Sequence, residues 1–262
     1  MLEGHRLLQV WQYKFQEEKT FDAVLNTASK YGYTGVLVKA LDGEIWMNQY
    51  DPAQDALYSL DQIDQQVLQA HVRGLLYCCW TNPLYDPPSL DEAERTGEIA
   101  QRVDALFLDV EPYASFWGAN RDPGLATRFM QQVRAIAPQA YIVLQPDPRA
   151  DRLREIRIEE WLPYIDAIAG QHYFNDFQSS VAREVDRIQD IANVYHKSMI
   201  PTLPGNADPA DLITLKLQLK QWVAWRLGSM NKVQQSILGS SSINVAAIRN
   251  AMDNLWAYTK RM

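Results

Sequence analysis

Short apolar runs alternate with longer helical patterns along this sequence, and this alternation restricts the fold more than any other feature does. Between the runs, apolar residues recur at helical spacing and the patterns end at Gly or Pro. Strands that alternate with helices build parallel βα units. Eight such units predict an α/β fold, the (β/α)8 TIM barrel. The expected strands cover residues 7–13, 34–40, 74–80, 105–111, 140–146, 167–173, 198–204 and 222–226.

The chain fits one barrel without a second domain. Its 262 residues are an ordinary length for a single barrel, and no linker, low-complexity tract or internal repeat interrupts them. We therefore predict one domain over residues 1–262. The segment 228–242 has the composition of an extended loop, and a closing helix is expected over 243–262.

Charge and apolar content restrict the partners. A formal net charge of −7 argues against binding to nucleic acid or to an anionic membrane surface. No signal peptide is seen, and no stretch reaches the roughly 18 apolar residues that span a bilayer, so we expect a cytoplasmic location by default. Cys78 and Cys79 are adjacent in an apolar run, which predicts buried thiols rather than a disulfide or a zinc site. Nothing in the sequence indicates an oligomeric state.

Two carboxylates end the fourth expected strand, "ALFLDVE". Because alternate residues of a strand share a face, Asp109 and Glu111 should both point into the barrel mouth, and Val110 should pack outward. Barrel active sites lie at the carboxyl ends of the strands. Two acids this close can push their pKa values apart, so that one is ionised and the other donates a proton. Glycoside hydrolysis needs this division, and we predict Glu111 and Asp109 as catalytic residues.

Polar and aromatic side chains follow several other expected strands. Such a combination suits sugars, which have apolar faces and hydroxyl edges. For some of these residues a structural role is the alternative, since Lys39 and Asp42 can form a salt bridge and His172 can be a hydrogen-bonded core histidine. The predicted substrate-binding residues are Lys39, Asp42, Trp80, Tyr113, Trp117, Gln145, Asp147, His172, Tyr173 and Arg226.

Other chemistries have little support in the sequence. It contains no glycine-rich dinucleotide fingerprint, P-loop, nucleophile elbow or two-histidine metal helix. We predict no cofactor and no resident metal. A hydrolase that binds a metal through Asp109 and Glu111 is a third hypothesis, because hard cations accept oxygen ligands.

Two motifs carry a family resemblance. "VLVKALDG" at 36–43 and "LFLDVE" at 106–111 resemble the glycoside hydrolase family 25 lysozymes, which are N-acetylmuramidases with an Asp-x-Glu on a barrel strand. "GLLYCCWTNP" and "GQHYFND" fall where that family has its third strand and its Gln-Tyr strand. The resemblance implies that Glu111 is the general acid and that Asp109 stabilises charge or orients an N-acetyl group. More broadly, the chain resembles chitinase-type barrels.

The first expected strand differs from that family. It offers Gln9 and Gln12, whereas the lysozymes have an aspartate there. Our main hypothesis is a glycoside hydrolase that acts on a glycan, with N-acetylated amino-sugar polymers as the candidate substrate. The alternative is a non-catalytic carbohydrate-binding barrel, because fold alone does not fix function.

Overall fold

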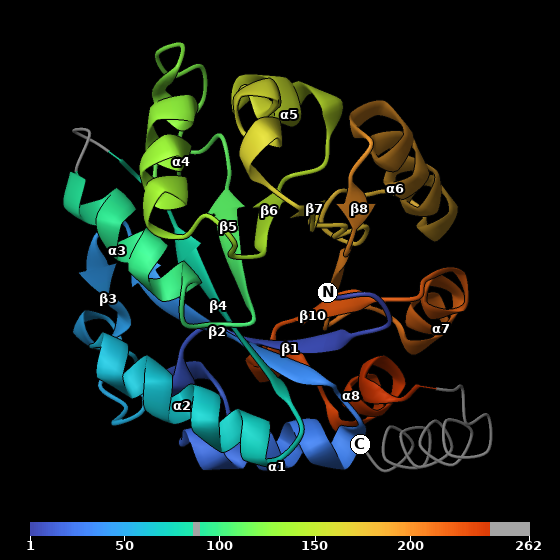
Figure 1. Cartoon of the computed structure of the whole chain (residues 1–262). Coiled ribbons are helices and arrows are strands. Elements are labelled where there is room, and N and C mark those ends of the chain that lie inside the picture. The colour runs from blue at the N-terminus through green and yellow to red at the C-terminus, as the bar shows by residue number, and fades with distance from the viewer. Residues whose placement is uncertain (86–89, 242–262) are drawn as a thin grey trace.

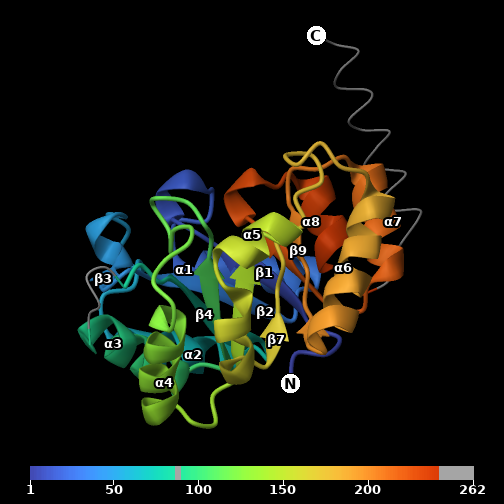
Figure 2. The same cartoon turned by 90° about the horizontal axis from the view of Figure 1, so that it is seen from above.

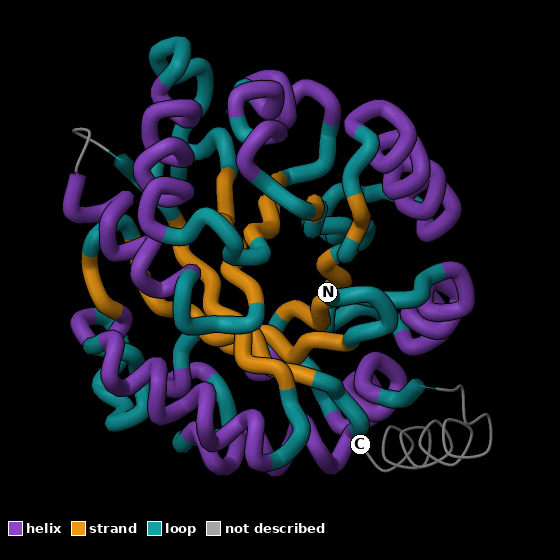
Figure 3. Tube along the Cα trace, in the orientation of Figure 1, coloured by secondary structure: helices purple, strands orange, loops and turns teal. Residues whose placement is uncertain are grey.

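The protein is a ring of parallel strands surrounded by helices (Figures 1 and 3). This computed structural model describes residues 1–85 and 90–241. The strands are β1 (Arg6–Val10), β2 (Gly35–Asp42), β3 (Ile45–Trp46), β4 (Leu76–Asn82), β5 (Ala105–Val110), β6 (Ile142–Pro146), β7 (Ala167–Ile168), β8 (Ser198–Met199), β9 (Thr202–Pro204) and β10 (Trp222–Trp225). The helices are α1 (Phe21–Tyr31), α2 (Leu60–Val72), α3 (Leu90–Ala100), α4 (Leu125–Ile136), α5 (Ala150–Glu155), α6 (Val181–Tyr195), α7 (Pro209–Gln218) and α8 (Lys232–Gly239).

The ring closes through a strand that is split in two. Neighbouring strands follow the order β8-β7-β6-β5-β4-β2-β1-β10-β9, and only Ile200 and Pro201 separate β8 from β9. Proline has no N–H to donate, which interrupts the ladder at this point. Beyond it, the Thr202 N–H donates to the Gly170 carbonyl and the His172 N–H donates to the Thr202 carbonyl, both at 2.9 Å. The two pieces therefore act as the seventh strand of an eight-stranded barrel.

Alternation along the strands creates two apolar layers. Side chains that point inward fill the barrel, and their neighbours in sequence pack beneath the helices. The inner cluster contains Leu7, Leu37, Phe107, Val143 and Val223. The outer cluster contains Leu8, Val38, Leu108, Val110 and Leu144.

The helices begin and end at sequence signals. Side chains of Thr20, Ser59 and Ser180 cap the first turns of α1, α2 and α6 by accepting a backbone N–H. Gly32 ends α1 in the left-handed conformation with φ of 84°. Seen from above, α6 and α7 lie next to each other on the outside of the barrel (Figure 2). No helix in the described ranges is long and apolar enough to cross a membrane.

The predicted TIM barrel is confirmed, and several local expectations are corrected. The run 167–173 is regular only over β7, because its second half turns away into the loop that leads to α6. The segment 228–242, expected to be a loop, contains α8. Asn231 and Gln234 form a capping box that starts this helix, and Val233, Ile237 and Leu238 bury its inner face. The helix expected over 243–262 lies outside the described residues.

Candidate active site

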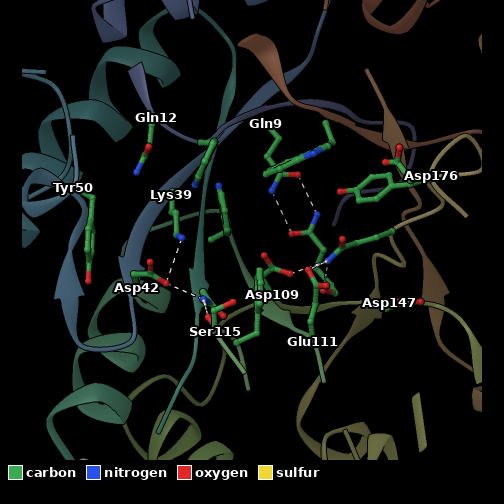
Figure 4. Close-up of a pocket in the computed structure, with 18 of the residues that line it drawn as sticks. Gln9, Gln12, Lys39, Asp42, Tyr50, Asp109, Glu111, Ser115, Asp147 and Asp176 are labelled. Atoms are coloured by element: carbon green, nitrogen blue, oxygen red, sulfur yellow. Dashed lines mark hydrogen bonds and ion pairs between the residues drawn. The ribbon is translucent and has the colours of Figure 1, made fainter. Parts of the chain in front are cut away.

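A cavity of about 510 Å³ opens at the carboxyl ends of the barrel strands (Figure 4). Residues at or just after the ends of β1, β2, β4, β5, β6, β7 and β10 line it. These residues are Gln9, Trp11, Gln12, Lys39, Asp42, Tyr50, Trp80, Asn82, Asp109, Glu111, Ser115, Phe116, Gln145, Asp147, Gln171, Tyr173, Asp176, Phe177 and Trp225. The strand ends that the sequence marks with polar residues therefore converge on one cavity.

Asp109 and Glu111 both line this cavity, whereas Val110 between them is fully buried in the outer layer. This arrangement is the one that strand alternation predicts. Asp109 is the deeper acid, with 6% of its surface exposed, and Glu111 is only partly buried. A substrate in the cavity would meet Glu111 before Asp109.

The amide of Gln171 contacts both acids. Its Nε2 donates to Asp109 Oδ1 at 2.8 Å and to Glu111 Oε1 at 2.9 Å, and this nitrogen lies 3.3 Å from the Gln145 carbonyl oxygen. The two carboxyl groups are close enough for the charge of Glu111 to act on Asp109. Two neighbouring carboxylates repel each other, which favours a proton on one of them. The pair is therefore suited to hold one proton beside a fixed amide donor.

Burial makes this pair retain its proton. It raises the pKa of Asp109 well above the ordinary value, and the neighbouring Glu111 charge raises it further, while the Lys39 ammonium opposes the shift. Burial also raises the pKa of Glu111, and the Gln171 hydrogen bond partly offsets that rise. A carboxyl group that is protonated above its usual pH range can act as a general acid.

Lys39 and Asp42 form one polar wall of the cavity. Their charged groups lie 3.4 Å apart, and Lys39 Nζ is 4.8 Å from the centre of the Trp80 ring. Asn82 Nδ2 donates to Asp42 Oδ1 at 2.8 Å and to the Ser115 carbonyl at 3.2 Å. The salt bridge considered from the sequence is present, and both its members also line the cavity.

Asp147 is held on the opposite wall by an arginine. Its side chain is 2% exposed, and Arg149 Nε approaches its two oxygens at 3.0 and 3.1 Å. Tyr113 donates its hydroxyl to Asp147 Oδ2 at 3.1 Å and accepts from Arg149 Nη2 at 2.9 Å. The Arg149 guanidinium also lies 4.5 Å from the centre of the Phe177 ring. These contacts tie together the loops that follow β5, β6 and β7.

Neutral amides form the floor. Gln145 Nε2 donates to Gln9 Oε1 at 3.0 Å and to Thr202 Oγ1 at 2.8 Å, and Gln9 Nε2 lies 3.3 Å from Gln145 Oε1. The Thr202 hydroxyl in turn donates to the Ala169 carbonyl at 3.1 Å. The first strand thus supplies a hydrogen-bonded amide where the resembled lysozymes have an acid.

Aromatic rings line the other sides of the cavity. Trp80 and Trp225 meet edge to face with centres 5.8 Å apart, and Tyr173 stacks on Trp225 at 6.4 Å. The sequence-based list of site residues omits Trp11, Asn82, Gln171 and Trp225. Trp225 ends the eighth strand and Gln171 precedes His172, so position at a strand end was the available signal. Trp11 was assigned to a strand that in fact stops at Val10.

Three predicted ligands lie elsewhere. His172 is fully buried and points away from the cavity, because it is one residue out of phase with Gln171, and its Nδ1 lies 3.0 Å from Glu184 Oε2. Trp117 packs under the helices, with its ring centre 4.8 Å from that of Trp161. Arg226 is not among the lining residues, and its guanidinium lies 4.4 Å from the centre of the Trp11 ring.

Tyr113 has an intermediate position. Its ring is outside the set of lining residues, at the rim, and its hydroxyl bonds to Asp147, which does line the cavity. Of the other aromatic residues at strand ends, Phe116 lines the cavity, whereas Tyr85 and Phe174 are buried. Among the described residues, no group of three or more His, Cys, Asp or Glu side chains could hold a metal ion.

Comparison with solved structures decides the fold class. The endo-1,4-β-mannanase from Rhizomucor miehei aligns with a TM-score of 0.65 at 10% identity, over 93% of this chain and 95% of that chain. The fold is a TIM barrel. A chitinase from the same organism aligns with a TM-score of 0.53 at 10% identity, over 90% of this chain and 98% of that chain. A xylanase and α-amylase inhibitor protein from Scadoxus multiflorus aligns with a TM-score of 0.57 at 11% identity, over 89% of this chain and 96% of that chain.

Sequence comparison adds no family. No protein-family model and no curated protein sequence matches the chain. At the identities above, the structural likeness establishes the barrel alone, and it does not show membership of the family 25 lysozymes. The similar barrels include glycan-degrading enzymes and an inhibitor, so the choice between these functions depends on the site.

Proposed function

We propose that the protein is a glycoside hydrolase in which Glu111 protonates the glycosidic oxygen of a bound glycan. The observation that carries this proposal is the pair of carboxyl groups, Asp109 and Glu111, that lines the cavity at the carboxyl end of the barrel and shares the amide of Gln171. Glu111 is the acid that reaches the open cavity, and its raised pKa keeps a proton available. The aromatic rings around it offer apolar surfaces for sugar faces.

The closeness of the two acids selects the mechanism. In most glycosidases the two carboxyl groups flank the scissile bond, about 5–9.5 Å apart. One amide nitrogen, Nε2 of Gln171, contacts Asp109 at 2.8 Å and Glu111 at 2.9 Å, so Asp109 lies on the same side as Glu111 and not across the sugar ring as a separate nucleophile. A nucleophile supplied by the substrate resolves this, and the 2-acetamido group of an N-acetylated amino sugar is such a group. We therefore propose N-acetylated glycans as the substrate class.

The reaction then has two steps. Glu111 gives its proton to the leaving oxygen as the C1–O bond breaks, and the acetamido oxygen bonds to C1. The positive charge that develops on the sugar is stabilised by the negative charge left on the pair, with Asp109 directed at the acetamido N–H. In the second step the Glu111 carboxylate takes a proton from water, and the oxygen of that water displaces the acetamido oxygen at C1.

The remaining polar residues of the cavity would bind hydroxyl groups. Lys39 and Asp42 offer a donor and an acceptor on one wall, and Asp147 offers an acceptor on the other. Tyr173 lines the same cavity as both acids and stacks on Trp225. Gln145 holds the floor. We propose these five residues, with Trp80 and the rim residue Tyr113, as the substrate contacts.

Hydrolysis of chitin oligosaccharides tests this proposal. Wild-type protein should release reducing ends, and Glu111→Gln should reduce turnover about 10²-fold or more, because the amide cannot donate the proton. Binding, measured by calorimetry, should survive in this variant. Glu94→Gln on the exposed side of α3 is the matched control and should leave turnover unchanged. Peptidoglycan carries the same acetamido group and is the second substrate to assay, and mannan, which lacks it, is the comparison.

A non-catalytic glycan-binding barrel is the second candidate. It is favoured by the neutral floor, where Gln9 and Gln145 bond to each other in place of a first-strand acid. If wild-type protein and Glu111→Gln bind chitin oligosaccharides equally and neither releases reducing ends in long incubations, the binding barrel replaces the hydrolase.

A further inference from the structure

We propose that Gln171 is a positioning residue that holds Asp109 and Glu111 in one arrangement and confines their shared proton to the two carboxyl oxygens that its amide does not contact. This inference rests on the proposed function only in its purpose, which is to explain how the site holds its proton donor in place. The position of the proton itself can be tested without a substrate.

The orientation of the amide follows from its partners. Nε2 of Gln171 faces Asp109 Oδ1, Glu111 Oε1 and the Gln145 carbonyl oxygen, and all three are acceptors. Turning the amide over would set its own oxygen against three other oxygens. Only the orientation with the NH2 group toward the acids is consistent with the contacts.

Counting hydrogens then places the proton. An amide nitrogen carries two N–H groups, and the two shortest contacts, at 2.8 and 2.9 Å, go to one oxygen of each acid. Those oxygens accept hydrogen bonds, so they are the unprotonated oxygens of the pair. The shared proton is left with Asp109 Oδ2 or Glu111 Oε2. One amide thus restricts which oxygen atoms of the two acids can carry the proton.

Gln171 is itself rigidly held. Its backbone pairs with Thr202 in an isolated bridge between β7 and β9, and its N–H donates to the Pro146 carbonyl at 3.0 Å. Its side chain is 6% exposed. A buried amide on a fixed backbone can hold two acids in place, whereas a mobile surface side chain would follow them.

Removing the amide should change the proton affinity of the pair. Hydrogen bonds from Gln171 stabilise the ionised carboxylates, and the bond to Glu111 lowers the pKa of that acid. Gln171→Met keeps the length of the side chain and removes both donors. We expect the pair to lose its last proton at a pH about one to two units higher, the size of a lost hydrogen bond to a charged group.

The experiment is a carboxyl ¹³C NMR titration of the full chain, with Asp109→Asn and Glu111→Gln used to assign the signals. Gln145→Met is the matched control, since Gln145 is a buried glutamine of the same cavity whose side chain bonds to Gln9 and Thr202 and not to the acids. It should leave the titration midpoint in place. Gln171→Glu provides a second variant, because its protonated form regains an O–H donor at low pH and its ionised form repels the pair.

The outcomes separate the two proposals. An upward midpoint shift in Gln171→Met and Gln171→Glu, with none in Gln145→Met, supports the positioning role even if no glycan is cleaved. Equal midpoints in all proteins, or equal shifts in the Gln171 and Gln145 variants, overturn it even if the protein is an active hydrolase. If Gln171→Met does not fold, the Gln171→Glu titration alone decides, since an unchanged midpoint there also overturns the proposal.

Discussion

At the scale of single residues, the protein keeps a carboxyl group where a carboxylate is unfavourable. Asp109 is among the buried polar residues of the barrel and lies next to a second acid. Its charged form has lost water and gained a neighbour of the same sign. Such a position reduces stability at neutral pH, and it is expected at sites that need a proton donor.

Asp109→Asn should reveal this cost as a pH-dependent gain in stability. Because its pKa is raised in the folded protein, the stability that protonated Asp109 provides is fully present below its ordinary value of 3.8 and is lost as the pH rises through the raised pKa. Asparagine does not ionise, so the variant avoids this loss. The difference in Tm, variant minus wild type, should grow between about pH 4 and pH 8 in thermal scans.

The exposed Asp190→Asn on α6 is the control for that scan, and it should not reproduce the growing difference in Tm of Asp109→Asn. A difference for Asp109→Asn that falls as the pH rises would contradict the assigned direction of the Asp109 shift.

At the scale of elements, the sequence predicts which face of a strand each side chain takes better than it predicts where the strand ends. Strand alternation correctly places Asp109 and Glu111 on one side and Val110 on the other. The same rule, applied past the end of β7, places His172 on the opposite face from Tyr173, but both residues were expected to bind substrate because the regular strand was taken to reach residue 173. Where a strand stops depends on loop contacts, such as the bond between His172 and Glu184, that no local pattern contains.

Loops and helix ends set the other limits of prediction. Trp80 lies near the end of β4 and Trp117 follows the end of β5. Trp117 nevertheless packs against Trp161, a partner 44 positions away that only the folded chain brings near. The α8 helix lies in a segment rich in Gly and Ser, for which a loop was expected. Its capping box is the local sequence signal that indicates a helix. The cavity could thus be located from sequence, and its exact lining could not.

Gly35, the first residue of β2, gives a prediction for an element. A Cβ there would lie 2.8 Å from both Leu7 Cδ2 and Leu76 Cβ, so Gly35→Ala must push strands apart. Alanine usually stabilises a strand relative to glycine, but overpacking costs about 1–3 kcal/mol. We expect a Tm lower by about 2–4 °C per kcal/mol in thermal scans of a chain of this size.

Leu68→Ala, at a side chain on α2 that is 65% exposed, is the control and should change the Tm little. A Gly35→Ala protein that melts at or above the wild-type temperature would show that the strands tolerate the methyl group.

At the scale of the whole molecule, negative charge limits which ligands can approach the cavity. The chain has a net charge of −7. Among the described residues that line the cavity, five are acidic and one is a lysine, namely Asp42, Asp109, Glu111, Asp147, Asp176 and Lys39. Fields of this kind repel anions over about 10 Å at 0.1 M salt.

Glycans of different charge should therefore separate in a binding assay. Neutral chitin oligosaccharides should bind with little dependence on salt, because their contacts are hydrogen bonds and ring stacking. Alginate oligosaccharides of similar length should bind much more weakly at low salt, and added salt should reduce the difference. Calorimetry at about 0.02 and 0.3 M salt measures both effects. Equal affinity of the two glycans at low salt would contradict this account.

The amide floor of the cavity restricts the route by which the acid pair exchanges protons with water. Gln9, Gln145 and Thr202 bond to one another, and apolar side chains such as Leu7, Phe107 and Val143 fill the barrel beneath them. The Asp109 and Glu111 pair can therefore exchange protons with bulk water only through the mouth. A glycan that covers the mouth closes this route for as long as it stays bound. In the proposed hydrolysis, the proton that Glu111 gives to the departing sugar would then be replaced by the water molecule that completes the reaction, so each turnover would restore its own acid.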